Sequence, residues 1–286
     1  MYELTEKMGT LYLCPTPIGN LEDMTYRAVR VLTEAAVVAA EDTRHTRKLF
    51  SHFSIHTPLI SYHEHNKMQQ GPQLVERLLQ GEDVALVSDA GMPGISDPGS
   101  DLVRLALEAG ITVIPLPGAN AALTALIASG LDTTCFSFIG FLPKTGKKRR
   151  ELLETWKHHP CTLIFYESPH RLKETLSELE EVLGDRQAVA ARELTKKFEE
   201  FIRMSLSEMR GHFALHTPRG EFCLLVAGGE EGSEAPAKEL LPVEEAVLAL
   251  VEAGIDKKEA IKQVALERKV PKREVYQAVL TWEQKK

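Results

Sequence analysis

The chain has 286 residues, of which 43% are hydrophobic and 26% are charged, and it carries a formal net charge of −7. This length favours two or three domains, and the hydrophobic content excludes a wholly disordered chain. The acidic balance argues against a protein that coats nucleic acid nonspecifically, so any such contact has to come from local basic segments. Residues 1–13 lack the pattern of a secretory signal, and no segment approaches the roughly 20 apolar residues of a membrane span. We therefore expect a cytoplasmic protein with no membrane contact.

Short aliphatic segments alternate with helical patterns over the first 116 residues. Strands are expected at 11–14, 37–40, 84–88 and 112–115, and helices through 28–35, 49–53 and 102–109. Runs such as VALVS are typical of buried strands. The alternation predicts an α/β domain over 1–116, with a mostly parallel sheet and helices on its faces.

The pattern changes after the turn signal Pro117-Gly118. Strands are expected at 136–141, 162–166, 188–191, 200–204 and 222–227, with fewer helical patterns between the last three. This favours a second domain of mixed α+β type over 117–229. Residues 230–240 contain no apolar run and are expected to be a linker. Residues 241–286 show three short amphipathic patterns, which predict a small helix-turn-helix-like unit.

Neither the cysteines nor the histidines predict a metal site. The cysteines lie in or beside apolar strand-like segments and form no CxxC pair: Cys14, Cys135, Cys161 and Cys223. We expect structural thiols in a reducing compartment and neither a zinc site nor a disulfide framework. His63-Glu64-His65 offers two imidazoles, but no third ligand completes a set, and we predict no bound metal.

Four predicted strands of the first domain run into loops rich in Gly, Pro and small polar residues, namely 15–20, 41–44, 89–99 and 117–121. Ligands of open α/β sheets bind beyond the carboxyl ends of the strands, so four such loops at one edge indicate a ligand crevice. The dinucleotide signature G-x-G is absent. Residues 140–148 fail as a P-loop, because five residues separate the glycines and Lys148 replaces Ser or Thr. Loops with few basic residues suit a ligand without phosphate, such as the sulfonium S-adenosylmethionine (SAM).

Seven motifs in collinear order carry a resemblance to a known family: PTPIGNLEDMT, AAEDTRHTRKLF, SDAGMPGISDPG, PGANAALTAL, GFLPKTGKKRREL, FYESPHRL and ARELTKKFEE. Over residues 9–229 the chain resembles the ribosomal RNA small subunit methyltransferase I family of the tetrapyrrole methylase superfamily. The helical tail is also similar to that family's C-terminal helix-turn-helix. The resemblance implies a two-domain tetrapyrrole-methylase-like fold and a homodimer. It also implies SAM-dependent 2′-O-methylation of a cytidine ribose at the decoding centre of 16S ribosomal RNA.

The resemblance also implies which residues hold SAM between the two domains. The motif positions are Pro17, Ile18, Ser88, Asp89, Ala90, Ile95, Asn120, Ala121, Glu167, Leu194 and Ala227. The chain departs from the tetrapyrrole branch in a longer loop after Asp89, with a second Asp-Pro-Gly, and in Glu167, where that branch often has an apolar residue. Both departures fit a different methyl acceptor.

A ribose hydroxyl is a poor nucleophile, so a nearby base or a cation that favours the alkoxide should help its methylation. Candidates at the end of the second strand are Glu41, Asp42 and Arg44, and a second set is Glu193 with Lys196. We hypothesise that Glu41 or Asp42 assists deprotonation while Arg44 orients the RNA backbone. The alternative for the two acids is the start of the helix that follows, where negative charge is favourable.

The densest basic segment comprises Lys144, Lys147, Lys148, Arg149 and Arg150. It enters a predicted helix, where five cations oppose the helix dipole, and this unfavourable placement favours a role in binding RNA phosphates. Arg171 is expected to join it. The locally basic tail, with Lys272 and Arg273 off its apolar face, could bind RNA, dock on a ribosomal protein or pair two protomers. The expected partner of the whole chain is 16S rRNA or the 30S subunit.

Two other functions remain open from the sequence. Methylation of a tetrapyrrole ring or a protein side chain could use the same scaffold, although neither would need the basic segment or the helical tail. A non-catalytic RNA-binding protein would need no crevice loops. SAM binding and salt-sensitive binding to ribosomal RNA would separate these possibilities.

Overall fold

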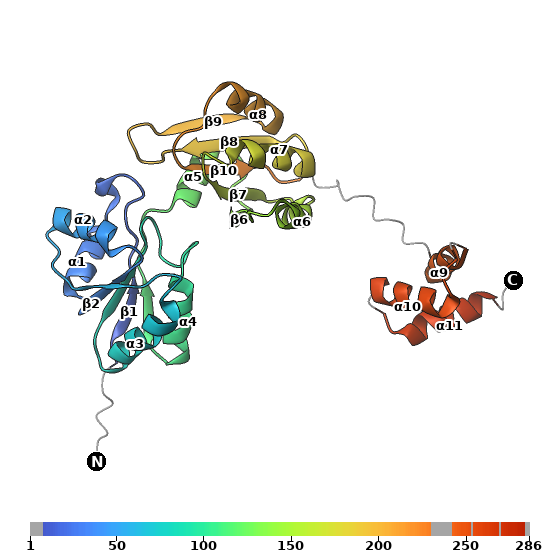
Figure 1. Cartoon of the computed structure of the whole chain (residues 1–286), viewed down its shortest axis with the longest axis horizontal. Coiled ribbons are helices and arrows are strands. Elements are labelled where there is room, and N and C mark those ends of the chain that lie inside the picture. Colours follow the sequence, from blue (N-terminus) through green and yellow to red (C-terminus); the bar gives the residue numbers. More distant parts are fainter. Residues whose placement is uncertain (1–7, 230–241, 253, 269, 284–286) are drawn as a thin grey trace, which may run out of the picture. The chain divides into compact units, whose positions relative to one another are not determined.

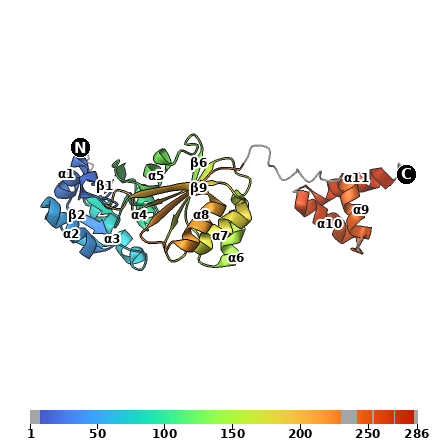
Figure 2. The same ribbon diagram turned by 90° about the horizontal axis from the view of Figure 1, so that it is seen from above.

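The computed structural model describes residues 8–229, 242–252, 254–268 and 270–283. The chain divides into two compact units, residues 1–229 and 230–286. The first unit contains two five-stranded sheets (Figures 1 and 2). The predicted linker, 230–240, lies outside the described residues.

The first sheet is parallel throughout and has the order β3-β2-β4-β1-β5. Its strands are β1 (Thr10–Leu13), β2 (Val37–Ala40), β3 (Leu59–Ser61), β4 (Val84–Val87) and β5 (Thr112–Pro115). Helices α1 (Tyr26–Glu34) and α2 (Thr43–Phe53) contribute to the core on one face, and α3 (Lys67–Leu79) and α4 (Gly99–Glu108) to the core on the other. Val38 and Ala40 belong to the first core and Val37 and Ala39 to the second, which is why β2 is apolar at every position.

The second sheet is mixed, with the order β6-β7-β10-β8-β9. Its strands are β6 (Phe136–Phe141), β7 (Thr162–Glu167), β8 (Gln187–Arg192), β9 (Glu200–Ser205) and β10 (Phe222–Val226). Only β6 and β7 pair in parallel; the other three pairs are antiparallel. Helices α6 (Gly146–Trp156), α7 (Leu172–Leu183) and α8 (Leu206–Leu215) pack on one face, and α5 (Ala121–Ser129) packs on the other. The predicted sequence of a parallel α/β sheet followed by a mixed sheet is confirmed.

A strand and a helix of the first domain, β3 and α3, escaped the sequence prediction. Strand β3 has three residues and lies at the sheet edge, so its apolar signal is short. Helix α3 contains Gly71 and Pro72, two residues that usually end a helix. Leu74 and Leu78 are buried one turn apart on it, and their packing on the sheet outweighs the poor local propensity.

The expectation that the cysteines form no disulfide is wrong. Cys135 and Cys161 form a disulfide, whereas four free thiols were predicted. Phe136 and Thr162 are register partners in β6 and β7, so the two cysteines directly before them are neighbours. Because the two cysteines are 26 residues apart in the chain, the sequence alone does not show that the register of β6 and β7 makes them neighbours. Cys14 and Cys223 are free and buried, and desolvation by burial raises the pKa of each thiol to about 12.

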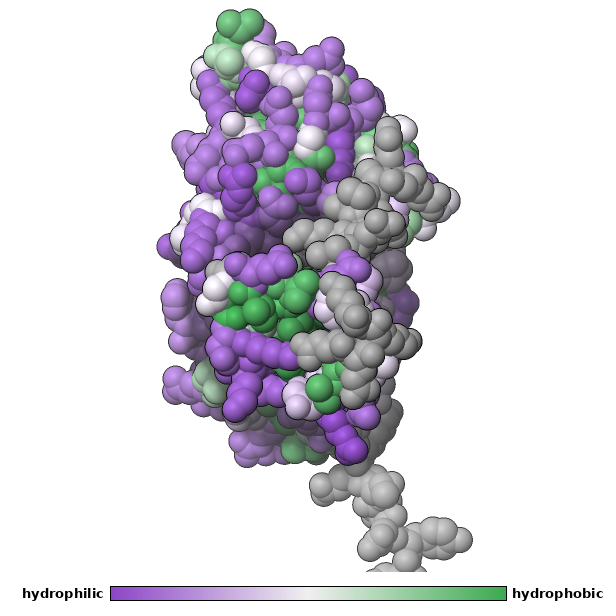
Figure 3. Space-filling view, turned by 90° about the vertical axis from the view of Figure 1, so that its right-hand side faces the viewer, coloured by the Kyte–Doolittle hydropathy of each residue, from purple (hydrophilic) through white to green (hydrophobic). Residues whose placement is uncertain are grey.

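The C-terminal unit contains three helices, α9 (Val243–Glu252), α10 (Lys257–Arg268) and α11 (Lys272–Glu283). They enclose a small core that includes Val247, Ile261, Val264 and Val275. Apolar side chains also remain on its surface, namely Leu248, Val251, Leu266, Tyr276 and Leu280. Figure 3 shows a face of the molecule on which small groups of apolar side chains lie between polar ones. Among the described helices of the chain, none is both long and apolar enough to cross a membrane.

Candidate functional site

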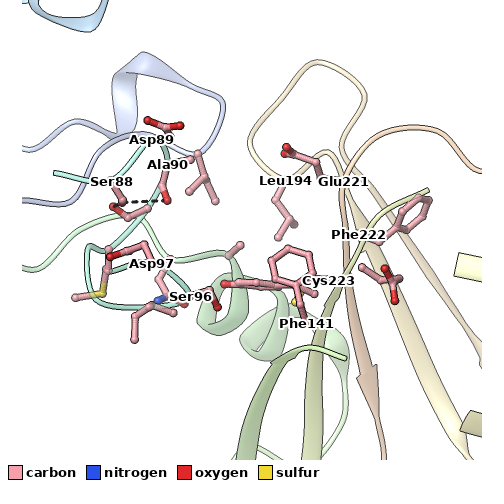
Figure 4. A pocket seen from close by; sticks show the side chains of 18 of the residues that line it. Ser88, Asp89, Ala90, Ser96, Asp97, Phe141, Leu194, Glu221, Phe222 and Cys223 are labelled. Carbon is pink, nitrogen blue, oxygen red and sulfur yellow. Dashed lines mark hydrogen bonds between the residues drawn. The ribbon is translucent and has the colours of Figure 1, made fainter. Parts of the chain in front are cut away.

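A cavity of about 570 Å³ lies within the first unit, lined by residues from both sheets (Figure 4). This volume is within the range of pockets that enclose a cofactor or other small molecule. The first sheet contributes Ile18, Glu41, Ser88, Asp89, Ala90, Gly91, Met92, Ile95, Ser96 and Asp97 from loops at its carboxyl edge. Asn120, Ala121, Phe141, Tyr166, Glu167, Ser168, Pro169, Ala191, Leu194, Lys196, Glu221, Phe222 and Cys223 complete the lining.

The loop after β4 is held in shape by its own hydrogen bonds. The Ser88 hydroxyl donates to the carbonyl oxygen of Gly91 over 3.2 Å. Thr16 donates its hydroxyl to the Ser88 carbonyl and forms a backbone bridge with Gly91, which ties this loop to the one after β1. Farther along, the Asp97 carboxylate accepts hydrogen bonds from the backbone of Gly94 and Gly99. These contacts fix the cavity wall before any ligand binds.

The loop between β8 and β9 reaches toward the first sheet. Glu193 and Thr195 adopt positive φ angles of 50° and 64°, which are uncommon for residues other than Gly. A Cβ atom added to Gly19 would collide with the side chain of Lys196, so this loop touches the loop after β1. The cavity is thereby bordered by segments of both sheets.

The charges of the lining favour a cationic ligand. It holds five carboxylates, namely Glu41, Asp89, Asp97, Glu167 and Glu221, and Lys196 is the one lysine or arginine among the residues that line it. Apolar side chains, including Ile18, Ala121 and Leu194, supply the remaining wall. A phosphate group would be repelled by such a lining, whereas a sulfonium or ammonium group would be attracted.

Glu41 combines exposure to the cavity with a perturbed pKa. Partial burial raises the pKa of its carboxyl, and the charges of Asp89 and Asp97 raise it further. The Asp89 carboxylate accepts a hydrogen bond from the backbone amide of Asp42 over 3.0 Å, which fixes the end of β2 against the loop after β4. A carboxylate with a raised pKa is a stronger base than an ordinary one, so Glu41 is suited to accept a proton.

Asp42 and Arg44, by contrast, do not line the cavity. Asp42 is the N-cap of α2 and accepts a hydrogen bond from the Arg44 amide over 2.8 Å. The two side chains also form an ion pair, and hydrogen bonds from the Arg44 side chain and backbone lower the pKa of Asp42. For Asp42 the geometry therefore favours the alternative of a helix start, with Arg44 as its ion-pair partner, whereas Glu41 lines the cavity.

Lys196 is paired with two carboxylates. Its Nζ lies 3.1 Å from Glu193 Oε1 and 3.0 Å from Glu221 Oε2. Burial lowers the pKa of this lysine, but the hydrogen bonds to Glu221 and Glu193 outweigh burial and the net pKa is raised. Lys196 is therefore protonated near neutral pH and acts as a fixed cation.

Most of the cofactor contacts expected from the resemblance lie around this one cavity, but Pro17 and Ala227 do not line it. Pro17 directly precedes Ile18, and Ile18 lines the cavity. Ala227 was expected there because the resemblance implies a cofactor contact at its position. In fact β10 runs antiparallel to β7, and Phe222 at its start pairs with Glu167. Ala227 thus lies five residues farther along, roughly 17 Å away at the opposite edge of the sheet.

The same strand direction explains which lining residues the sequence did not reveal. Glu221, Phe222 and Cys223 precede or begin β10, and loops were sought only at the carboxyl ends of strands. Phe141 and Tyr166 were assigned to strands and given no role. The antiparallel pairing of β8 and β9, by contrast, could have been predicted from the sequence. Residues 193–199, which connect these strands, are too few for a parallel crossover and therefore require a hairpin.

The basic segment also needs correction. Arg149 is 1% exposed and forms ion pairs with Glu174 and Glu178 of α7, so it is removed from the predicted RNA-binding surface. It lies on the face of α6 that packs against α7, and its place among four consecutive basic residues, 147–150, gives no sign of this packing. Arg150 is paired with Glu181 over 2.7 Å.

Arg171 is directed inward, where it donates to the carbonyl oxygens of Leu142 and Pro143. Lys144, Lys147 and Lys148 remain exposed. Among the ion pairs of the described residues, only Lys147 of these three takes part, in a loose contact of 4.0 Å with Glu151.

No group of three or more potential metal ligands occurs within the described ranges. The buried Glu167 carboxylate, 2% exposed, is satisfied by the Ser168 amide and the Thr175 hydroxyl.

The sequence was compared with protein families and with known proteins. Residues 10–210 match the family described as Tetrapyrrole (Corrin/Porphyrin) Methylases. Ribosomal RNA small subunit methyltransferase I of Halalkalibacterium halodurans is 55% identical over 278 residues, 96% of both chains. The chain belongs to this methyltransferase I family of the tetrapyrrole methylases. The protein of the same name from Bacillus subtilis is 54% identical over 274 residues, covering 95% of this chain and 94% of that one.

The fold of the first unit recurs in solved structures of the tetrapyrrole methylases. Uroporphyrin-III C-methyltransferase from Thermus thermophilus, complexed with S-adenosyl homocysteine, superposes with a TM-score of 0.53. It is 20% identical and covers 78% of this chain and 98% of its own. At this identity the likeness concerns the fold alone.

Proposed function

We propose that the chain is a SAM-dependent methyltransferase that transfers a methyl group to the 2′-hydroxyl of a cytidine in 16S ribosomal RNA. The observation that carries the proposal is the acidic, partly apolar cavity at the carboxyl edge of the first sheet. The names of relatives about half identical over nearly the whole chain support ribosomal RNA as the acceptor.

The cavity residues fit SAM by their chemistry. When bound, SAM supplies an electrophilic methyl group on a positively charged sulfur. Three of the lining carboxylates, Glu41, Asp89 and Asp97, form no ion pair among the described residues and favour that charge, whereas Glu167 and Glu221 are paired with Arg171 and Lys196. The hydrogen-bonded loop from Ser88 to Asp97 offers ordered backbone and side-chain groups for the polar parts. Ala90, Ala121 and Leu194 supply apolar contact. The small side chains of Ala90 and Ala121 leave room for the ligand.

Glu41 and Lys196 are the candidates for activating the acceptor hydroxyl. In this proposal the Glu41 carboxylate, whose pKa is raised, accepts the hydroxyl proton. Lys196, kept protonated by Glu193 and Glu221, favours the developing negative charge on oxygen. The protein otherwise contributes by holding the acceptor in line with the methyl group.

Exposed lysines support an RNA acceptor over a tetrapyrrole ring or a protein side chain. Lys144, Lys147 and Lys148 lie around the first turn of α6, where positive charge opposes the helix dipole. The N-cap residue Thr145 makes no side-chain capping hydrogen bond. An RNA phosphate would relieve the repulsion and accept from the free amides. The homodimer, the 30S subunit as substrate and the cytoplasmic location stay predictions.

Mass-spectrometric mapping of ribose methylation in 16S rRNA tests this proposal. Purified protein, SAM labelled in its methyl group and unmethylated 30S subunits should yield one labelled 2′-O-methylcytidine. Naked 16S rRNA in a parallel reaction identifies the form of the substrate. A label found on a nucleobase, or none in RNA although SAM is bound, would refute the assignment.

A further inference from the structure

We propose that Phe141 is the platform on which the base of the acceptor nucleotide stacks. This inference rests on the proposed function, because it assigns the position of the RNA nucleotide at the cavity. It concerns a residue that lines the cavity and yet is 58% exposed, an unusual state for a phenylalanine.

The orientation of Phe141 results from a bulge in β6. Alternation along a regular strand would put Phe141 on the same face as Ile139, which packs into the core beneath α6, α7 and α8. The register between β6 and β7 shifts between Phe138 and Gly140 instead, and Phe141 pairs with Tyr166. Side chains of paired residues share a face, so the bulge turns Phe141 to the face that Tyr166 and Phe138 occupy.

Gly140 permits this change of face. Its φ of +74° lies in the left-handed region, which other residues adopt only with strain. A Cβ atom there would also lie 3.4 Å from the Ser96 hydroxyl of the opposite loop. The bulge thus meets the other wall of the cavity, and Ser96 and Phe141 appear near each other in Figure 4.

Neighbouring rings hold Phe141 while leaving much of it accessible. Its ring meets Tyr166 edge to face, with centroids 5.7 Å apart, and Tyr166 packs in the same way against Phe138 at 5.0 Å. Ile95, on the loop after β4, is 41% exposed and lines the same cavity. An aromatic and an aliphatic side chain from opposite walls are the kind of pair that holds an unstacked base.

The position along the chain connects the platform to the exposed lysines. Phe141 ends β6, and Lys144, Lys147 and Lys148 follow within seven residues. Proteins that bind single-stranded RNA combine aromatic stacking of bases with cationic contacts to the backbone. A nucleotide turned out of its helix could place its base on Phe141 and its flanking phosphates near the lysines. Its ribose would then lie toward the cavity.

Kinetics with 30S subunits test the inference. Phe141→Leu keeps an apolar side chain but removes the aromatic face, and Phe141→Trp retains stacking. Phe136→Leu is the matched control, because Phe136 is also exposed on β6 but does not line the cavity. We expect Phe141→Leu to lower kcat/KM for 30S subunits by roughly 5- to 150-fold, the usual effect of losing one stacked base. The Trp and control variants should stay near the wild type.

SAM affinity and melting temperature, measured on the same variants, distinguish the explanations. Both should be unchanged in Phe141→Leu. Equal kinetics for Phe141→Leu and Phe136→Leu would overturn the inference while leaving the proposed function intact. A parallel loss of SAM affinity would also overturn it and place the adenine of SAM on Phe141. A wild-type protein that methylates no RNA would remove both this inference and the proposed function.

Discussion

Replacing Arg149 should destabilise the fold and leave RNA binding by the folded protein unchanged. Its side chain is 1% exposed, and it pairs with Glu178, which is 24% exposed, and Glu174, which is 64% exposed. Removing one partner of a buried ion pair costs about 3 to 5 kcal/mol. Because both glutamates can be rehydrated after the loss, we expect Arg149→Met to fall at the lower end, about 3 kcal/mol. For a unit of this size that corresponds to a decrease of about 6 to 12 °C in melting temperature.

Lys148 is the matched control, because it is the preceding residue and its side chain is exposed. Lys148→Met should leave the melting temperature within about 2 °C, since exposed substitutions rarely change stability by more than about 0.5 kcal/mol. It should instead reduce the salt dependence of RNA binding by up to about one unit of slope. Thermal melting and binding at several salt concentrations measure both effects. An Arg149→Met protein as stable as the wild type, with weaker RNA binding, would refute the assignment of Arg149 to the core.

Three further predictions concern the cavity and the C-terminal unit. Glu41→Gln should lower kcat by roughly 10²- to 10⁴-fold and remove the rise of wild-type activity through the raised pKa of Glu41. A carboxyl group whose pKa is raised in the folded state stabilises the fold only at pH values at which it is protonated. This contribution to the free energy of unfolding is lost as the pH rises through the raised pKa. At neutral pH the neutral Gln variant should therefore melt no lower than the wild type; a clear decrease would contradict this. Lys196→Met should lower kcat by about 100-fold with SAM affinity retained, as single-turnover kinetics would show. Residues 1–229 alone should bind SAM normally in calorimetry but methylate 30S subunits poorly.

The first sheet could be predicted well because its signals are local. Segments such as 37–40 and 84–87 are apolar at every position, and a loop rich in glycine and proline, 89–99, follows the second of them. In a parallel sheet the loops that follow the strands meet at one edge whatever the strand order. The loops at 15–20, 41–44, 89–99 and 117–121 were therefore assigned to one crevice from the sequence, and Ile18, Glu41, Asp89 and Asn120 from these loops do line one cavity.

The second sheet was harder because its chemistry depends on strand direction and register. Ala227 does not line the cavity, and the antiparallel course of β10, which takes this residue away from Glu167, leaves no mark in the apolar sequence of the strand. The bulge at Gly140 determines on which face of the sheet Phe141 lies. The sequence pattern does not reveal a bulge, because one extra residue leaves the hydrophobic character of the strand unchanged. Partners distant in the chain were also invisible: Arg149 pairs with Glu178, and Cys135 with Cys161.

SAM binding to two alanine variants tests most directly whether this cavity holds the cofactor. Ala121 and Ala227 were both expected to contact SAM, both are half-buried, and only Ala121 lines the cavity. Isothermal titration calorimetry should show wild-type affinity for Ala227→Leu and greatly weakened binding for Ala121→Leu, with both proteins folded. Loss of binding in Ala227→Leu, with normal binding in Ala121→Leu, would place SAM elsewhere and contradict the account.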